Sequence, residues 1–156
     1  MDKEIKVGII SDTHGLLRTE VKEILKQCDY ILHGGDVNKQ AVIDELEDIA
    51  TLFVVRGNND KEWAEHLPQN LKFEIGGIRF YMVHDKKFIP TQMENTDIIV
   101  FGHSHKYLEE TRDGILWLNP GSCGRRRFDQ SISMAVMTIK SGTWTIEKIE
   151  LNPEMK

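Results

Sequence analysis

The chain has 156 residues, of which 20 are Lys or Arg and 25 are Asp or Glu, so its formal net charge is −5. This length suits one domain over residues 1–156, and a 40% hydrophobic, 29% charged composition without low-complexity tracts excludes a disordered or fibrous chain. The acidic balance argues against broad binding to nucleic acid. No apolar run approaches the roughly 20 residues of a membrane helix, and the charged start of the chain does not resemble a signal peptide. We therefore expect a cytoplasmic protein.

The first third of the chain alternates between strand and helix patterns. Short apolar runs rich in β-branched and aromatic residues predict strands at 5–10, 30–32 and 52–55. Apolar residues at helical spacing predict one helix between 17 and 28 and a second between 42 and 50, with Asn38 as its N-cap. Because crossovers in such repeats are right-handed, the three strands are expected to be parallel, with their carboxyl ends at one edge.

The rest of the chain is rich in strand patterns. A hairpin is predicted over residues 73–80 through Gly76-Gly77, and further strands are predicted at 80–83, 98–101, 107–111, 115–118, 132–139 and 143–151. We therefore predict an α/β fold in which two mixed β-sheets pack face to face as a sandwich with flanking helices.

Five of the predicted strands end beside residue types that bind metals. The candidate ligands are Asp12 and His14, Asp36, Asn58, His84, and His103 and His105. Each motif alone is weak, because Asp-x-His, Gly-Asp and Gly-Asn also occur in ordinary turns. If the chain stays extended from residue 12 to 14, both side chains there point toward one place. Together, the five loops predict a cluster at one sheet edge.

The chemistry of these donors narrows the kind of site. Cys28 and Cys123 have no CxxC spacing, so a thiolate zinc site is not indicated, and both are expected to be free thiols. Imidazole, carboxylate and amide donors without thiolate suit Mn²⁺, Fe²⁺, Zn²⁺ or Co²⁺. Seven candidates exceed the needs of one catalytic ion with open positions. Two ions bridged by a carboxylate would use all of them, and such pairs hydrolyse phosphate esters.

The ordered motifs resemble those of the calcineurin-like metallophosphoesterases. The matching segments are Asp12-x-His14, Gly35-Asp36, Gly57-Asn58-Asn59-Asp60, His84 and Gly102-His103-Ser104-His105. The short length and Asn119-Pro120-Gly121-Ser122 resemble the small bacterial and archaeal phosphodiesterase subgroup. The resemblance implies a dinuclear phosphodiesterase in which a metal-bridging hydroxide attacks phosphorus. It assigns Asp12, His14, Asp36 and His105 to the first ion, and Asp36, Asn58, His84 and His103 to the second, with Asp36 bridging.

One position departs from the pattern of the larger superfamily. Many members carry a general-acid His directly after the metal-binding Asn, whereas this chain has Asn59, and an amide cannot supply that proton. Activity toward poor leaving groups is therefore in doubt. Around the site, Asp60 is expected to orient a neighbouring loop or ligand, and His33 to form hydrogen bonds rather than bind metal. Residues 119–122 are expected to fix a loop against the metal site, and Ser122 is also a candidate to hydrogen-bond a ligating histidine. Asp85 is either an additional acid near the site or a surface residue.

The predicted site has a catalytic set and a substrate-binding set. We assign Asp36, Asn58 and His103 to the catalytic set, and Asn59, Arg125 and Arg126 to substrate binding. The basic run 125–127 is either a rim that contacts phosphate or a solvated turn. The expected cofactor is two divalent ions, with manganese as the first candidate and iron, zinc, cobalt or nickel as alternatives.

Two other functions compete with a phosphodiesterase that acts on a small substrate. One is a phosphomonoesterase with the same metals. The other is a protein-interaction scaffold like the retromer subunit of similar fold, which would be expected to have lost ligating histidines that this chain retains. An edge strand of the β-rich part offers a route to homo-oligomers.

Overall fold

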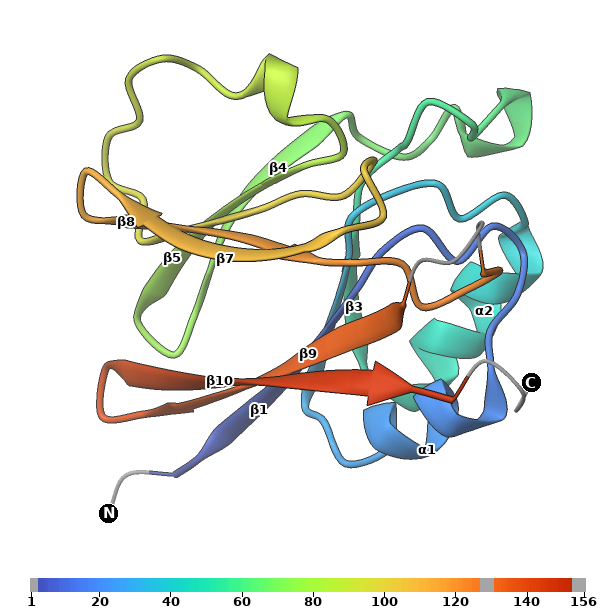
Figure 1. The fold of residues 1–156 in the computed structure, drawn as a ribbon, viewed down its shortest axis with the longest axis horizontal. Helices are drawn as coiled ribbons and strands as arrows, with labels where there is room; N and C mark the ends of the chain where they lie inside the picture. Colours follow the sequence, from blue (N-terminus) through green and yellow to red (C-terminus); the bar gives the residue numbers. More distant parts are fainter. Residues whose placement is uncertain (1–2, 127–130, 153–156) are drawn as a thin grey trace.

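The computed structural model describes residues 3–126 and 131–152, which form two five-stranded β-sheets packed face to face (Figure 1). Sheet A has the order β10-β9-β1-β2-β3, and sheet B has the order β4-β5-β6-β8-β7. The strands of sheet A are β1 (Ile5–Ile10), β2 (Tyr30–His33), β3 (Thr51–Val54), β9 (Ile132–Lys140) and β10 (Thr143–Leu151). The strands of sheet B are β4 (Asn70–Ile75), β5 (Ile78–Val83), β6 (Ile98–Val100), β7 (Tyr107–Arg112) and β8 (Ile115–Pro120).

Both sheets are mixed, as predicted. In sheet A, β1, β2 and β3 are parallel, and β9 runs antiparallel to both β1 and β10. In sheet B, β5, β6 and β8 are parallel, and the edge strands β4 and β7 pair antiparallel with β5 and β8. The predicted hairpin through Gly76-Gly77 joins β4 to β5, and both glycines have the positive φ that such a turn favours.

The helices cover only one outer face of the sandwich. Helices α1 (Thr19–Leu25) and α2 (Gln40–Ile49) lie on the side of sheet A that faces away from sheet B (Figure 1). Alternation along β1 explains this arrangement, because Val7 and Ile9 pack between the sheets while Ile10 packs with the helices. The part of the chain that the structure describes has no helix long and apolar enough to cross a membrane.

The predicted N-cap of α2 is wrong. The helix begins at Gln40 after an extended Lys39, whose side chain makes no capping hydrogen bond. Asn38 instead has a left-handed backbone (φ 73°), and its amide Nδ2 lies 3.4 Å from Nδ1 of His14. The contact with a neighbouring loop therefore determines the position of Asn38, although its residue type favours a helix start.

The outer face of sheet B is covered by a loop instead of a long helix. Residues 84–97 connect the parallel strands β5 and β6 and contain a single 3₁₀ turn, η2 (Lys86–Phe88); another such turn, η1 (Glu62–Ala64), follows β3. Ile89 and Met93 of the connection pack on Tyr81 and Ile99. The sandwich thus has a helical side and a loop side, and the loops after β1, β2, β3, β5 and β6 carry the candidate ligands.

Candidate metal centre

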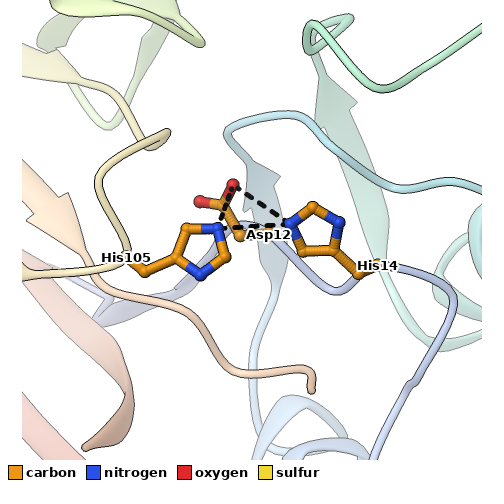
Figure 2. Close-up of side chains that lie close together, drawn as sticks. All are labelled: Asp12, His14 and His105. Atoms are coloured by element: carbon orange, nitrogen blue, oxygen red, sulfur yellow. Dashed lines mark hydrogen bonds and ion pairs between the residues drawn. The ribbon is translucent and has the colours of Figure 1, made fainter. Parts of the chain in front are cut away.

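Three predicted ligands from distant parts of the chain converge on one point. Asp12 follows β1, His14 lies two residues later, and His105 comes from the loop after β6 (Figure 2). Oδ1 of Asp12 lies 3.4 Å from Nε2 of His105 and 3.8 Å from Nε2 of His14. The two Nε2 atoms are 3.2 Å apart. The three donor atoms lie within 4.8 Å of one another, close enough to share one ion.

A second group lies directly beside the first and shares Asp12 with it. Nε2 of His84 lies 3.2 Å from Oδ2 of Asp36 and 3.9 Å from Oδ1 of Asp12. The same Oδ2 of Asp36 is 3.7 Å from Nε2 of His14 in the first group. Asp36 therefore lies between His14 and His84, where its carboxylate can contact both groups.

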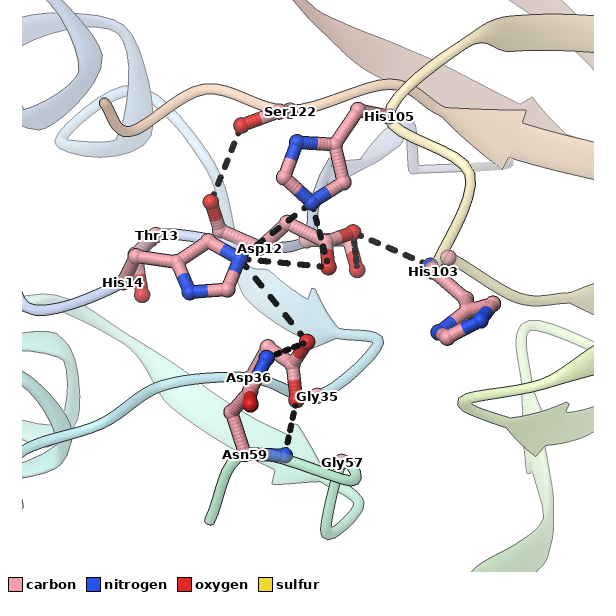
Figure 3. A network of polar contacts seen from close by, with 12 residues as sticks. Asp12, Thr13, His14, Gly35, Asp36, Gly57, Asn59, His103, His105 and Ser122 are labelled. Atoms are coloured by element: carbon pink, nitrogen blue, oxygen red, sulfur yellow. Dashed lines mark hydrogen bonds and ion pairs between the residues drawn. The ribbon is translucent and has the colours of Figure 1, made fainter. Parts of the chain in front are cut away.

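Asn58 and His103 form a separate pair at the side of these groups. Nδ1 of His103 lies 3.2 Å from Oδ1 of Asn58, and the His103 side chain is 45% exposed. The backbone N–H of His103 donates to Oδ2 of Asp12 at 3.2 Å, which fixes the loop after β6 to the loop after β1 (Figure 3). The structure thus brings five predicted ligands into tight contact and places the other two next to them.

The buried donors of this cluster fit a cation. Oδ1 of Asp12 and Nε2 of His84 are buried and have no hydrogen-bond partner among the described residues. A buried polar atom without a partner costs about 1–3 kcal/mol. Both atoms face the other donors of the cluster, so a divalent ion held there would satisfy them. The nitrogen and oxygen donors are those that divalent transition metals accept.

The charges of the cluster are strongly coupled. Burial opposes protonation of His84, but the carboxylates of Asp36 and Asp12 outweigh it and raise the pKa of His84 to about 9. Burial likewise opposes ionisation of Asp36, but His84 foremost, with Asn59 and His14, holds the pKa of Asp36 well below its usual range. Without an ion, a proton on His84 balances Asp36. Metal binding must therefore displace a proton.

The loops place these side chains through left-handed backbone conformations. Five of the seven predicted ligands have a positive φ: Asp12 (54°), His14 (47°), Asp36 (61°), His103 (77°) and His105 (63°). The backbone from residue 12 to 14 is therefore not extended, although the side chains of Asp12 and His14 converge as predicted. Such φ values are uncommon outside glycine and are maintained where tertiary contacts fix them. The contacts within the site thus determine the shape of the loops.

Asp60 joins the loops after β2 and β3. Its Oδ2 accepts the backbone N–H groups of Asp36 at 3.0 Å and Gly57 at 2.9 Å, and its Oδ1 accepts that of Asn38 at 2.8 Å. The side chain is buried and belongs to neither group of candidate ligands. Asp60 thus orients a loop, as its position in the sequence suggested.

His33 connects the loops after β1 and β2. Its Nδ1 accepts the backbone N–H of Gly35 at 3.0 Å, so its Nε2 carries the proton and donates to Oγ1 of Thr13 at 3.0 Å. Oγ1 of Thr13 in turn donates to the carbonyl of Val37 at 3.4 Å. Complete burial lowers the pKa of His33 to about 4, so the ring is neutral. His33 supports the cluster and does not face it.

The segment 119–122 fixes the other side of the site. Ser122 donates its hydroxyl to the backbone carbonyl of Asp12 at 2.9 Å, so the expected bond to a ligating histidine is wrong (Figure 3). Nδ2 of Asn119 donates to the carbonyl of Gly102 and to Oγ of Ser104, both at 3.1 Å. Ser11 donates to Oδ2 of Asp12 at 2.8 Å. The bonds from Asn119 and Ser122 agree with the expected role of this segment in fixing a loop against the site. The supporting role of Ser11 is new, because its residue type also suits an ordinary turn.

The predicted substrate-binding residues lie around the cluster. Asn59 donates from its backbone N to Oδ1 of Asp36 at 2.8 Å and from Nδ2 to Oδ2 at 3.1 Å, so it holds that carboxylate directly. Nε of Arg125 donates to the carbonyl of His14 at 3.3 Å, and Arg126 lines a cavity with His14. Arg127 lies outside the described residues.

Asp85 lies near a predicted ligand, and Cys123 is buried close to the site. Oδ2 of Asp85 lies 3.7 Å from Nε2 of His103, which resolves the open alternative in favour of an acid near the site. Cys123 is fully buried, and burial raises the pKa of its thiol to about 12. Its thiolate is therefore scarce at neutral pH, and Cys123 is not suited to be a nucleophile.

Comparison with known proteins supports the interpretation of this geometry. A family model described as the calcineurin-like phosphoesterase superfamily domain matches residues 5–142. The chain belongs to this superfamily. A probable metallophosphoesterase of Bacillus subtilis is 30% identical to this chain over 155 residues, and the match covers 91% of this chain and 89% of the relative. Membership places the chain among phosphoester hydrolases and implies a divalent metal cofactor, which the donor set fits.

Other relatives extend the comparison. A phosphodiesterase of Methanocaldococcus jannaschii is 29% identical over 140 residues, covering 76% of this chain and 84% of the relative. Vacuolar protein sorting 29 of Cryptosporidium parvum has a TM-score of 0.76 at 21% identity, covering 95% of this chain and 98% of that one. A structure described as a novel archaeal phosphodiesterase has a TM-score of 0.73 at 23% identity, and the match covers 94% of this chain and 100% of that one. The two structural likenesses confirm the fold.

Proposed function

We propose that this protein is a dinuclear metal-dependent phosphodiesterase. The observation that carries the proposal is the position of Asp36, whose Oδ2 lies 3.2 Å from His84 and 3.7 Å from His14 and so faces both ligand groups. One ion would be held by Asp12, His14, Asp36 and His105. The other would be held by Asp36, Asn58, His84 and His103, with manganese as the first candidate for both.

Bound divalent ions would supply positive charge for the phosphate oxygens and lower the pKa of water. The residues of the chain prepare this chemistry. Asp12 and Asp36 carry the negative charge that attracts the ions, and the bonds from Asn59 keep both oxygens of Asp36 in place. Because Asn59 donates to Asp36 and has no acidic proton to give, the proton for the leaving oxygen must come from water and not from this residue.

The space around the cluster favours a diester over a monoester. One cavity of about 470 Å³ is lined by Asn58, His84 and His103, and another of about 530 Å³ is lined by His14 and His105. A phosphate at the cluster therefore has room for a substituent on each side. A monoester would need only one. We accordingly propose a small phosphodiester as the substrate, hydrolysed in the cytoplasm.

A non-catalytic scaffold is the competing function, because a vacuolar protein sorting 29 shares the fold. The ligand set argues against it. His14, His84, His103 and His105 are all present, and their nitrogens point into the cluster or toward its edge. A protein that only bound partners would have no need for two buried carboxylates surrounded by imidazoles, an arrangement that is unfavourable without a cation.

The test is hydrolysis of bis(4-nitrophenyl) phosphate and of 4-nitrophenyl phosphate by metal-stripped protein titrated with Mn²⁺. We expect diester turnover that requires the metal and is lost in His103→Ala. His66→Ala is the matched control, because His66 is exposed and belongs to neither ligand group. Preference for the monoester would establish a phosphomonoesterase instead. Bound Mn²⁺ without turnover of either ester would contradict the enzymatic function and favour the scaffold.

A further inference from the structure

The two cavities beside the cluster differ in chemistry. The 530 Å³ cavity, here called the cationic cavity, is lined beyond the ligands by Asn38, Asn59, Lys61, Arg125 and Arg126. It has three cationic side chains and two amides, and no apolar side chain lines it among the described residues. In a chain with a net charge of −5, such a concentration of positive charge indicates an anionic ligand.

The loop that carries the two arginines is fixed in place beside the cluster. Arg18, itself buried, donates from Nε to the carbonyl of Gly124 at 2.8 Å. A Cβ at Gly124 would clash with the carbonyl oxygen of Thr13, so only glycine allows this close approach. Arg125 adds its bond to the carbonyl of His14. The guanidinium groups therefore extend from a backbone that is attached to the metal-binding loop, which reduces the ordering cost of ligand binding.

The cavity on the other side, here called the aromatic cavity, has a volume of about 470 Å³ and a different lining. Phe88 borders it with Arg56, Gln69 and Lys87. Phe88 is 64% exposed, and it is the one large hydrophobic side chain of the described residues that is exposed. Nζ of Lys87 lies 5.1 Å from the centre of its ring. An exposed aromatic ring flanked by polar side chains in a cavity suits a flat heteroaromatic group, which can stack on it.

We propose that the substrate is an asymmetric phosphodiester with a terminal phosphate on the substituent in the cationic cavity and a nucleobase on the substituent beside Phe88. This inference rests on the proposed phosphodiesterase function. Three cations match a phosphate dianion better than a single carboxylate, and guanidinium groups bind phosphate oxygens in pairs. Hydrolysis would break one P–O bond. Water would give its hydroxyl to phosphorus and its proton to the leaving oxygen, yielding a monoester and an alcohol.

A matched pair of dinucleotides tests the terminal phosphate. We expect the Mn²⁺-loaded protein to hydrolyse 5′-phosphorylated ApA with a kcat/KM at least about tenfold above that of unphosphorylated ApA, since charged hydrogen bonds contribute about 1.5–3 kcal/mol. In Lys61→Ala and Arg126→Ala this ratio should fall to within about twofold, by the same loss of charged contacts. Using the ratio cancels effects on basal turnover and folding. Lys72→Ala, on an exposed position of β4 outside both cavities, should keep the ratio.

Product-like ligands give a readout independent of turnover. By titration calorimetry, adenosine 3′,5′-bisphosphate should bind the wild-type protein about tenfold tighter than adenosine 3′-monophosphate, and Lys61→Ala should remove this difference. Phe88→Ala should leave this difference unchanged, because both nucleotides lack the substituent that lies beside Phe88. It should instead lower kcat/KM on both dinucleotides, whereas Phe88→Tyr should retain it.

The outcomes separate this inference from the function on which it rests. Metal-dependent turnover of bis(4-nitrophenyl) phosphate with equal rates on the two dinucleotides would overturn the inference and leave the phosphodiesterase intact. A preference for the phosphorylated dinucleotide that persists in Lys61→Ala and Arg126→Ala would also overturn the assignment to the cationic cavity. Absence of turnover on every diester would overturn both.

Discussion

The two sheets contribute different chemistry to the same cluster. The loops of sheet A supply both carboxylates, Asp12 and Asp36, whereas the loops after the strands of sheet B supply only imidazoles. The sheet A loops are joined by the buried side chains of Asp60 and His33. On the sheet B side, His103 is 45% exposed. The half of the site that carries the carboxylates is thus held rigidly, because two neighbouring carboxylates repel each other and need fixed donors. The half that carries only imidazoles includes the most exposed ligand, His103.

The largest effect is expected from the carboxylate between the two groups. Asp36→Asn removes the charge that faces both His14 and His84. We expect the protein to bind at most one Mn²⁺ per chain and to lose diester turnover by more than about a hundredfold, beyond the 10–100-fold typical of residues that only support a ligand. Metal content after dialysis and steady-state kinetics measure both. Two ions at parental affinity together with full activity would contradict the bridging role.

Asp60 tests whether the rigidity of the sheet A half depends on one buried carboxylate. Asp60→Ala leaves three backbone N–H groups without their acceptor, at about 1–3 kcal/mol each, so we expect the free energy of unfolding to fall by about 3 kcal/mol or more. Urea denaturation of the metal-free protein measures the change. Asp48→Ala, at an exposed position of α2, is the matched control and should change stability by less than about 0.5 kcal/mol. Equal stability of both variants would show that the network is dispensable.

The sequence predicts those features of the molecule that depend on neighbouring residues, and it misses those that depend on contacts between distant loops. The strands, the parallel order in sheet A and the candidate ligands are local signals, because each apolar run ends directly before its polar residues. The left-handed backbone at Asp12 and His14, the uncapped start of α2 and the bond from Ser122 to the Asp12 carbonyl are not local. They result from contacts between loops distant in sequence, which outweigh the preference of each residue for an extended chain or a cap.

The cavities were equally inaccessible to sequence patterns. Lys61 and Arg126 line one cavity from loops distant in the chain, and Phe88 lines the other from the covering loop of sheet B. The basic run 125–127 indicated a possible contact with phosphate. Lys61 is an isolated lysine beside the motif 57–60, and its neighbours in the sequence do not indicate that it lines this cavity. Only the packing of the loop at Gly124 against Thr13 brings the arginines to the metal-binding loop.

His33 tests the sheet A half through pH. Burial lowers its pKa to about 4 in the folded protein, so the unfolded chain, in which the usual value is 6.5, binds its proton more readily. Stability should therefore fall as the pH decreases from about 6.5 to about 4, by up to about 3 kcal/mol from this group. His84 acts in the opposite sense at higher pH, because its pKa is raised to about 9 and its stabilising contribution is lost as the pH rises through that value.

The variant His33→Asn isolates this contribution, because the Oδ1 atom of asparagine can accept the N–H of Gly35 in place of Nδ1. Urea denaturation of the metal-free proteins at pH 7 and pH 4.5 should show a smaller loss of stability in the variant than in the wild type. The difference between the two slopes removes the contribution of all other groups. Parallel profiles would show that His33 is not held neutral in the folded protein.

The smallest expected effect tests the sheet B half at Asp85. If Nδ1 of His103 faces the ion beside Asn58, its Nε2 carries the proton and faces Oδ2 of Asp85 at 3.7 Å. A carboxylate behind a ligating histidine strengthens the ligand, by about 10–100-fold in affinity at well-formed sites. Here the His103 side chain is 45% exposed and the contact is long, so water and salt screen it. For Asp85→Asn we therefore expect a loss of only about three- to tenfold in Mn²⁺ affinity, below that range.

The salt dependence of this loss separates an electrostatic role from a structural one. Calorimetric titration with Mn²⁺ should show a smaller difference between wild type and Asp85→Asn in 1 M salt than in 0.05 M salt, because the Debye length shortens from more than 10 Å to about 3 Å. Asp113→Asn, in the exposed turn between β7 and β8, should bind Mn²⁺ like the wild type. A salt-independent loss would mean that Asp85 acts through its bond to the N–H of Lys87 at the start of η2, and hence by shaping the covering loop of sheet B. A loss as large as that of Asp36→Asn would remove the contrast between the two halves, since both would then depend on a carboxylate to the same degree.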